Sequence, residues 1–359
     1  MTKKVRMVDL ARELGVTTVT VSNALNNRSG VSEELRQKIL DKARVMGYTR
    51  LRTQHETHHR KKLRLGVIVP AYFLSEQNAF YWAFFQAITQ EAEIRDMSVA
   101  MEQLESYTIR HMILPDLVTH RDCDLLIFLG PPGKQYLDMV LRSVRQPCVC
   151  LDCSSTLKSI PSVVSANYYG MAEMTEYLIK AGHTRIGFLG TVGSTEAIMD
   201  RYLGYRRALA THNLSFHDDW QIDDRKIQDG KVIIELPDHL PDAIVCNSDG
   251  SAAVLIEILQ TKGLQIPEDI SIVSYDGYLP ASETLPLTTM AVNFDEMARS
   301  AILALSRIYE KKEPGQWRFV IPGTLIEGQS VRQTSKQSHR SGSTIKRSSS
   351  RSIESAALR

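Results

Sequence analysis

From Leu63 onward the chain alternates between short apolar segments and segments with helical spacing, and this alternation limits the possible fold more than any other feature. Uninterrupted apolar segments are typical of strands that are buried on both faces of a parallel sheet. The expected strands form two successive series: 63–70, 97–104, 124–130 and 148–152, followed by 163–166, 185–190, 243–247 and 270–276. We therefore expect an α/β fold with two doubly wound parallel sheets, and ligands outside the carboxyl ends of the strands.

Helices are expected between these strands, because a helix usually connects two parallel strands. In the first series they fall near residues 80–93 and 134–143. In the second series they run through Tyr177, around 202–210 and up to Leu259.

The first 26 residues predict a different unit, two short helices joined by a sharp turn. Val8, Leu10, Ala11 and Leu14 recur at the spacing of one helix face. Gly15 follows directly and can adopt the positive φ that a tight turn requires.

The second of these helices is expected to have two different faces. Thr17 can cap its first amides, and Val21, Ala24 and Leu25 can pack against the first helix. The opposite face carries short, uncharged side chains that suit a DNA groove, and these are candidate base and phosphate readers: Thr18, Val19, Ser22 and Asn23.

A third helix is expected from Ser32, which is a good N-cap, with an apolar stripe formed by Leu35, Ile39, Ala43 and Met46. Three short helices in fewer than fifty residues suit a small DNA-binding head. A helical hairpin inside a larger domain is the alternative interpretation of this pattern alone.

Charge is distributed unevenly along the chain. Residues 1–62 hold 14 lysines and arginines against 6 acidic residues, residues 334–359 hold 6 against 1, and the total charge is only +2, so residues 63–333 carry −11. A basic head on an acidic body favours a polyanion-binding module joined to a sensing domain. No apolar segment approaches the ~20 residues that span a bilayer, and the N-terminus has no signal-peptide core, so we expect a cytoplasmic protein without membrane contact.

Catalytic and cofactor motifs are not found in the sequence. Gly130–Lys134 lacks the spacing of a P-loop, and Gly187–Gly193 does not follow the dinucleotide pattern GxGxxG. The acidic pairs Asp218–Asp219 and Asp223–Asp224 are interpreted as a solvated loop. No cofactor is expected, and an α/β enzyme is the disfavoured hypothesis.

The five cysteines raise the question of a metal or redox site. Cys148 and Cys150 fall in an expected buried strand, where a thiol behaves as a small hydrophobic side chain, and Cys153 follows them. Three histidines between residues 55 and 59 lie in a polar basic segment that is interpreted as a linker. We expect buried thiols and no metal.

Short motifs recur in order along the chain. The head holds VDLA (8–11), GVT (15–17), TVS (20–22), LN (25–26), VS (31–32) and GY (47–48), and the body holds GHTRI (182–186), RYLGY (201–205), SD (248–249), IPEDIS (266–271), SYD (274–276) and LTT (287–289). Through these motifs the sequence resembles the lactose-repressor/galactose-repressor (LacI/GalR) family of bacterial transcriptional regulators, to about Thr334.

The resemblance implies a helix-turn-helix DNA-binding domain at 1–48, a hinge at 49–62 and an effector-binding and dimerisation core at 63–333 of periplasmic-binding-protein type. One subdomain of the core would comprise about 63–164 and 293–321, and the other about 165–292 and 322–333. Residues 334–359 are expected to form a disordered basic tail because they are rich in Ser, Lys and Arg.

The function that the resemblance implies is that of a repressor. A homodimer, with a tetramer left open, would bind a pseudo-palindromic double-stranded DNA operator. A small-molecule effector, a sugar or a sugar derivative, would bind between the two core subdomains and change DNA binding.

The resemblance also implies roles for individual residues. In the head, the expected DNA contacts are Arg6, Thr17, Thr18, Val19, Thr20, Ser22, Asn23 and Asn26. In the core, the expected effector contacts are Asn78, Phe80, Tyr81, Arg201, Trp220, Ser248, Asp249, Asp276 and Phe294. Arginine and aspartate flanked by aromatic rings suit a polyol, but Arg201 and Asp276 could equally form a structural ion pair, and the aromatic residues could be core.

Three departures from the family pattern leave a second hypothesis open. Where the family hinge carries a leucine that enters the minor groove, this chain has Thr57, after Gln54. Ala166 replaces an acidic residue before Asn167, and the segment between Trp220 and Pro241 is short. The alternative is therefore a DNA-binding regulator with a degenerate pocket, controlled by a protein partner or by no ligand.

Overall fold

The computed structural model describes residues 5, 7–25, 30–46, 62–74, 79–157, 159–226, 232–278, 285–313 and 317–334. The chain divides into two compact units, residues 1–61 and residues 62–359. We call the first unit the head and the second the core.

The head consists of three helices, α1 (Met7–Leu14), α2 (Thr18–Leu25) and α3 (Glu33–Val45). Leu10, Val21 and Ile39 are fully buried where the three helices meet. Gly15 has φ +64° in the turn between α1 and α2, and Thr17 Oγ1 accepts a hydrogen bond from the Thr20 amide at 3.1 Å. The predicted helix-turn-helix and its glycine turn are confirmed, because the turn needs a positive φ and the N-cap needs a hydroxyl.

Arg36 of α3 holds the carboxyl end of α2. Its Nη1 donates to the carbonyl oxygens of Asn23 and Ala24, at 3.3 and 3.1 Å, and the side chain is buried. The last carbonyls of a helix have no partner within the helix, and a cation near them is favourable. Arg36 therefore fixes α2 relative to α3.

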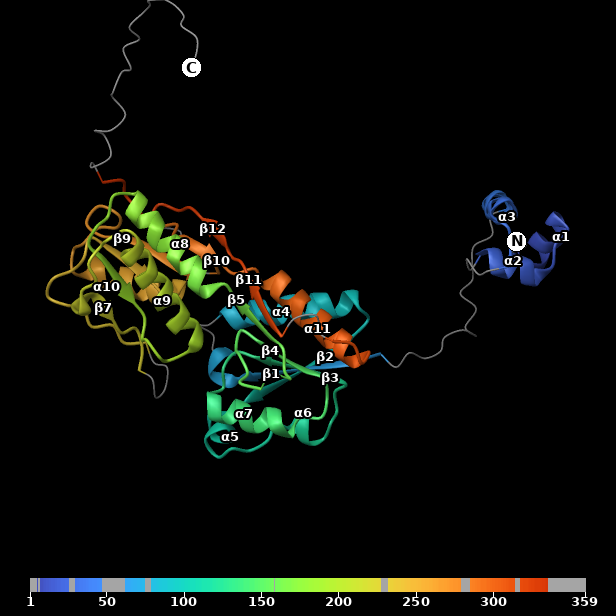
Figure 1. Cartoon of the computed structure of the whole chain (residues 1–359), viewed down its shortest axis with the longest axis horizontal. Coiled ribbons are helices and arrows are strands. Elements are labelled where there is room, and N and C mark those ends of the chain that lie inside the picture. Colours follow the sequence, from blue (N-terminus) through green and yellow to red (C-terminus); the bar gives the residue numbers. More distant parts are fainter. Residues whose placement is uncertain are drawn as a thin grey trace, which may run out of the picture. The chain divides into compact units, whose positions relative to one another are not determined.

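The first sheet of the core is entirely parallel, with strand order β11-β5-β4-β3-β1-β2. Its strands are β1 (Arg64–Pro70), β2 (Ser98–Leu104), β3 (Leu125–Leu129), β4 (Cys148–Leu151), β5 (Ser162–Ser165) and β11 (Arg318–Ile321). On one face lie α4 (Ala79–Ile94) and α11 (Phe294–Tyr309), and on the other lie α5 (Ser106–Arg110), α6 (Asp116–Thr119) and α7 (Lys134–Ser143) (Figure 1).

The second sheet has the strand order β12-β10-β9-β8-β6-β7. Its strands are β6 (Ile186–Leu189), β7 (Gln221–Ile222), β8 (Ala243–Cys246), β9 (Ser271–Asp276), β10 (Thr288–Ala291) and β12 (Thr324–Ile326). The helices α8 (Asn167–Lys180) and α9 (Glu196–Thr211) cover one face, and α10 (Asp249–Thr261) covers the other. Only the pairing of β10 with β12 is antiparallel among these strands.

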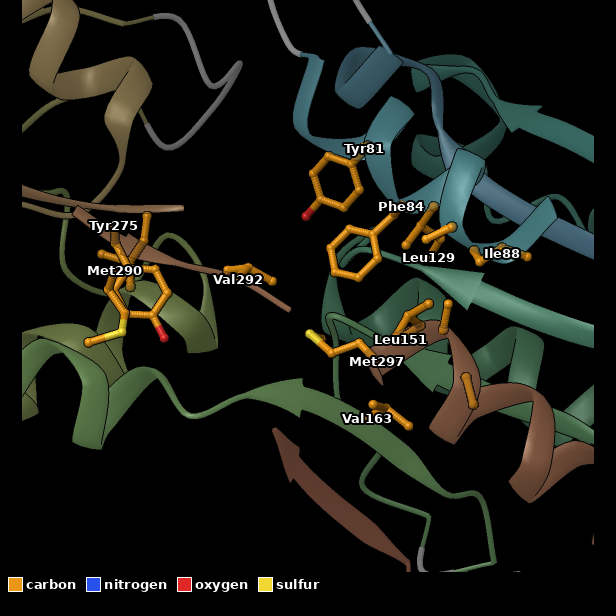
Figure 2. Close-up of a cluster of buried hydrophobic side chains, with 14 of the residues drawn as sticks. Tyr81, Phe84, Ile88, Leu129, Leu151, Val163, Tyr275, Met290, Val292 and Met297 are labelled. Carbon is orange, nitrogen blue, oxygen red and sulfur yellow. The ribbon is translucent and has the colours of Figure 1, made fainter. Parts of the chain in front are cut away.

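One buried cluster extends across both sheets. Phe84 and Leu151 belong to its part on the first sheet, Tyr275 and Met290 to its part on the second, and Val292 lies between the two parts (Figure 2). Val292 follows β10 and precedes α11, where the chain passes from the second sheet to the helices of the first. The chain also passes between the sheets after β5 and after β11.

The predicted fold class, α/β with two doubly wound parallel sheets, is confirmed, and the eight expected strands are all present. The segment 163–166, expected as the first strand of the second series, is instead β5 of the first sheet, because it pairs with β4 and β11. The pattern did not predict β7, β10, β11 and β12, which are short and lie toward the edges of the sheets, nor the 3-10 helices η1 (Ala71–Leu74) and η2 (Asp218–Trp220). It also gave no helix for 294–309, where α11 lies. Within the described ranges no helix combines the length and apolarity needed to cross a membrane.

Helices α8 and α9 approach closely at Gly204. A Cβ atom built on Gly204 would lie 2.2 Å from the carbonyl oxygen of Tyr168 and 3.0 Å from the amide nitrogen of Ala172. Both atoms belong to the backbone of α8, so they cannot move aside as a side chain could. The absence of a side chain at Gly204 therefore sets the distance between the two helices.

We expect Gly204→Ala to lower the free energy of unfolding of the core by about 1–3 kcal/mol, because overpacking must push α8 and α9 apart. Gly250→Ala is the matched control, since Gly250 lies in α10 and its nearest contact is 4.0 Å away. There the same change should be neutral or stabilise by up to ~1 kcal/mol. Urea unfolding followed by circular dichroism measures both, and equal effects at the two glycines would contradict the prediction.

Candidate functional site

The exposed face of α2 carries the predicted DNA-contacting residues that the structure describes. Thr18 and Val19 are exposed, and Val19 keeps 65% of its surface. Ser22 and Asn23 are half-buried on the next turn. The hydroxyls of Thr17 and Thr20 lie 2.9 Å apart at the start of the helix, where that of Thr17 serves as the N-cap. Arg6 and Asn26, the two remaining predicted contacts, lie outside the described residues.

In the core, Arg201 occupies the centre of a buried polar group. Its Nε donates to Asn167 Oδ1 at 2.7 Å, and its Nη1 donates to the carbonyl oxygen of Asn247 at 2.5 Å. Nη1 also lies 3.1 Å from Asp276 Oδ1, and the guanidinium carbon lies 3.9 Å from the centre of the Tyr275 ring. Arg201 thus joins α9 to the start of α8 and to the ends of β8 and β9.

Asp276 ends β9 in an unfavourable setting for a carboxylate. Burial raises its pKa to about 7, against the opposing effect of Arg201. Its Oδ1 is buried and receives no hydrogen bond from any described residue, and its backbone has φ 110°, a region that residues other than glycine rarely adopt. Backbone strain and an unsatisfied buried acceptor concentrate at functional sites.

A second buried carboxyl group comes from the first sheet. Asp152 follows β4, and Tyr81 of α4 donates its hydroxyl to Asp152 Oδ2 at 2.8 Å. Burial raises the pKa of Asp152 to about 6, while the Tyr81 hydrogen bond and the charge of Arg201 lower it. The charges of Asp152 and Asp276 also repel each other. We call Arg201, Asp276, Asn167, Asn247, Tyr275, Asp152 and Tyr81 the Arg201 cluster.

A third carboxylate, Asp224, lies fully buried behind the cluster. Arg225 binds it with both Nε and Nη2, at 2.6–3.1 Å, and Asn247 Nδ2, Ser251 Oγ and the Thr191 amide also donate to it. These donors hold the pKa of Asp224 well below its usual range even though burial acts in the opposite direction. The interpretation of Asp223–Asp224 as a solvated loop is wrong for Asp224, because these donors compensate its burial.

Arg225 connects this network to both the Arg201 cluster and a cavity. Burial lowers the pKa of Arg225, but Asp224 and, less strongly, Asp276 and Tyr81 raise it overall, and Arg225 lines a cavity of about 640 Å³ together with Thr191, Asp223 and Glu235. Its side chain keeps 26% of its surface. Arg225 is therefore a candidate ligand-binding residue that the sequence interpretation missed.

The structure brings some of the other predicted effector residues together. Phe80 packs edge-on against Phe84 and Phe294, with ring centres 5.3 and 5.2 Å apart, and Tyr81 stacks on Phe73 at 4.2 Å. Phe80 and Phe294 are partly buried and pack against the buried apolar cluster that extends across both sheets. Asn78 lies outside the described residues.

Ser248 and Asp249 have structural partners. Ser248 caps α10 by accepting from the Ser251 amide at 3.1 Å. Asp249 accepts hydrogen bonds from Ser274 and Thr289, at 2.5 and 2.7 Å, and from the amide of Tyr278. The side chain of Asp249 thereby ties α10 to β9 and β10.

Trp220 is not brought to the Arg201 cluster. Its indole nitrogen donates to the carbonyl oxygen of His239 at 2.9 Å, and its ring packs against His217. Trp220 immediately precedes β7, whereas Arg201 meets Asp276 and Asn247 at the carboxyl ends of β9 and β8.

Two residues of the cluster had a usable sequence signal. Asp152 and Asn247 each end an expected apolar strand, the place where ligand contacts are expected in a parallel sheet. Arg225 had none, because it lies in a polar segment without a recognisable period.

Within the described residues, the cysteines form no disulfide and belong to no candidate metal site. All five cysteines are unpaired and buried, as expected, and burial raises the pKa of the Cys148 and Cys246 thiols. No group of three or more potential metal ligands occurs in the part of the chain that the structure describes, while the three histidines between residues 55 and 59 lie outside it.

One family match covers most of the head, and a second covers every strand of the second sheet together with α11 and β11. Residues 6–50 match the family described as "Bacterial regulatory proteins, lacI family", and residues 175–331 match a "Periplasmic binding protein-like domain". The chain thus carries the lacI-family DNA-binding domain of a transcriptional regulator, which lies in the head, and a periplasmic-binding-protein-like domain in the core.

Individual relatives resemble the regulator over most of its length. The HTH-type transcriptional regulator RegA of Clostridium saccharobutylicum is 24% identical over 90% of this chain and 98% of its own. The HTH-type transcriptional repressor PurR of Pasteurella multocida is 26% identical over 85% of this chain and 92% of its own.

Solved structures share the fold of the regulator. The lac repressor dimer bound to operator and the anti-inducer ONPF has a TM-score of 0.60 at 21% identity, over 92% of this chain and 100% of that one. The CelR–cellobiose complex of a transcriptional regulator has a TM-score of 0.61 at 19% identity, over 91% and 100%.

We expect Arg36→Met to lower the free energy of unfolding of the head by about 1–3 kcal/mol, because two helix-end carbonyls lose a charged donor. Lys38→Met is the matched control, since the one ion pair that Lys38 forms with a described residue is exposed and joins it to Glu34 at 2.9 Å. It should cost about 0.5 kcal/mol or less. Thermal unfolding of residues 5–46 within the full chain, followed by amide NMR signals, distinguishes the two, and a Lys38 effect as large as that of Arg36 would contradict the assignment.

The raised pKa of Asp276 predicts a pH dependence of stability. A carboxyl group with a folded-state pKa of about 7 and an ordinary value of 3.8 stabilises the fold fully below pH 3.8, and this stabilisation is lost as the pH rises through about 7. Relative to Asp276→Asn, the unmodified protein should therefore lose up to ~1.4 kcal/mol of unfolding free energy per pH unit between about pH 5 and about pH 7.

Urea unfolding at three pH values within this range measures the difference. Asp116→Asn serves as the control, because the side chain of Asp116 is 85% exposed on α6. A difference between the Asp276 variant and the unmodified protein that does not change with pH would show that Asp276 is ionised throughout the range.

Proposed function

We propose that this chain is a sequence-specific transcriptional repressor that binds a pseudo-palindromic operator as a homodimer. We further propose that a small effector, a sugar or a sugar derivative, binds at the Arg201 cluster and changes the affinity for DNA. The observation that carries the proposal is the position of Arg201, which joins one helix start and two strand ends at the edge where parallel sheets bind ligands.

The exposed face of α2 supports the DNA-binding part. Val19 and Thr18 project from a helix whose other face is buried, and their side chains are short enough to meet base edges. Arg36 fixes the opposite end of the same helix. The lac repressor structure with the same fold is a dimer bound to operator, and dimers read half-sites related by two-fold symmetry.

The composition of the Arg201 cluster supports a small polar effector. Carboxyl, amide, guanidinium and hydroxyl groups are held beside aromatic rings, which is the arrangement that binds hydroxyl groups and covers the apolar side of a sugar. The CelR structure with the same fold is a complex with cellobiose.

We assign the parts of the chain as follows. Residues 1–48 bind DNA, residues 49–62 act as a hinge, and residues 63–333 bind the effector and form the dimer. One core subdomain comprises about 63–164 and 293–321, and the other about 165–292 and 322–333, so the Arg201 cluster receives Asp152 and Tyr81 from the first and Arg201 and Asp276 from the second. A ligand that contacts both can favour one arrangement of the two.

A regulator without an effector is the second candidate. It is favoured by the extent to which Arg201 is already bound by protein groups: Asn167, the Asn247 carbonyl, Asp276 and the Tyr275 ring. In that case the cluster would only hold the second sheet together, and a protein partner or no partner would control DNA binding.

Fluorescence anisotropy of full-length protein with labelled DNA from its own upstream region tests the proposal. We expect Val19→Ala to weaken specific binding about 5-fold or more, because an apolar contact with a base is worth ~1 kcal/mol or more. Val45→Ala is the matched control, since Val45 is an 83% exposed valine of the same head at the end of α3.

Two outcomes would contradict the DNA-binding part of the proposal. One is equal binding by the Val19 and Val45 variants. The other is equally tight binding to a full site and to an isolated half-site, because a dimer gains affinity from engaging both half-sites.

A further inference from the structure

The Arg201 cluster and the residues behind it contain more carboxyl groups than cations. In this buried group we count four carboxyl groups and two guanidinium groups among the described residues. The carboxyl groups are those of Asp152, Asp224, Asp249 and Asp276, and the guanidinium groups are those of Arg201 and Arg225. An uncompensated charge in a buried site is costly, so the imbalance indicates which ligand charge the site would accept.

Two of these carboxyl groups each accept at least three hydrogen bonds from protein donors. Asp224 receives the fork of Arg225 and three further donors. Asp249 receives Ser274, Thr289 and the Tyr278 amide. These two groups hold elements of the second sheet together. The charged groups that a ligand could contact are therefore Asp152, Asp276 and Arg201.

Arg201 alone does not satisfy both remaining carboxyl groups. Its Nε and Nη1 are already committed to Asn167 and to the carbonyl of Asn247. Asp276 Oδ1 is buried without a hydrogen bond although Arg201 Nη1 is 3.1 Å away, and among the described residues only Tyr81 donates to the side chain of Asp152. The carboxyl oxygens of Asp152 and Asp276 can therefore accept further hydrogen bonds, so a ligand that binds here must supply donors.

The electrostatic environment favours a donor that carries a positive charge. Asp152 and Asp276 repel each other, and burial raises the pKa of each, to about 6 and about 7. An anionic ligand would add to this repulsion, and a neutral one would leave it. A cation would remove it and would let both carboxylates ionise.

We propose that the effector carries a protonated amino group that binds Asp152 and Asp276, so that it is a polyhydroxyl amine such as an amino sugar rather than a neutral or an anionic sugar. This inference rests on the proposed function, because it concerns the ligand of the same site. The hydroxyl groups of such a molecule would meet the amide and aromatic groups of the cluster, and the ammonium group would meet the two carboxylates.

Two matched pairs of probes test the charge directly. Tris is compared with pentaerythritol, which replaces its amino group by a hydroxymethyl group, and 2-amino-2-deoxyglucose is compared with glucose. Calorimetric titration of the full chain in phosphate buffer near neutral pH should show that at least one amine binds ~10-fold or more tightly than its neutral counterpart. Equal or tighter binding of the neutral probes, or no binding by either amine, overturns the proposal.

Two variants of the same charge change locate the effect. Asp152→Asn removes the charge while its amide oxygen can still accept from Tyr81, and it should abolish the preference for the amine. Asp96→Asn makes the same change at a side chain that is 90% exposed ahead of β2, and it should keep the preference. An amine preference that survives Asp152→Asn would also overturn the proposal.

Anisotropy with operator DNA and the same four probes separates this inference from the proposed function. Amine binding that leaves DNA affinity unchanged would contradict the effector mechanism and support the ligand chemistry. Release or tightening of DNA by glucose or pentaerythritol alone would support the effector mechanism and contradict the ligand chemistry.

Discussion

The second sheet and its helices depend on one buried guanidinium group. Arg201 extends from α9 and meets the first residue of α8, the residue that follows β8, and the last residue of β9. A buried arginine is tolerated only when its donors are paired, so each of these elements must be in place before the charge is compensated. Asp224 shows the same arrangement with the opposite charge, because five donor groups from four residues converge on it: Thr191, Arg225, Asn247 and Ser251. The buried polar groups therefore restrict the arrangement of these elements as strictly as the packing of the apolar core does.

Much of the fold could be predicted from the sequence, because buried parallel strands leave a local signal. Segments such as 124–130 and 243–247 are continuous apolar stretches, and their position in the sheets follows from the short connections. The strands β10, β11 and β12 leave no such signal: they lie at or near sheet edges, carry threonine or arginine, and pair with segments far away along the chain. Their assignment depends on tertiary contacts that no local window contains.

The candidate sites were predictable to different extents. In the head, the capping role of Thr17 and the exposure of Val19 followed from helical spacing over a few residues. In the core, Arg201 and Asp276 came from a family resemblance, and the structure places them in contact. Trp220 and Asp249 carried the expected chemistry but have other partners. Arg225 gave no sequence signal because it lies in a polar segment without a recognisable period, just beyond the two-residue strand β7. A sequence shows which residue types are present, but it does not show which group each side chain contacts in the fold.

The three passages of the chain between the two sheets have a consequence for biosynthesis. The strand β11, which completes the first sheet beside β5, and β12, which completes the second beside β10, both lie within the last part of the described core, between residues 318 and 326. The head is self-contained within residues 1–61 and can fold as soon as it leaves the ribosome. Neither sheet of the core has all of its strands until residue 326 has been made. A nascent chain of this regulator would therefore display a folded DNA-binding head before the sheets of the core are complete.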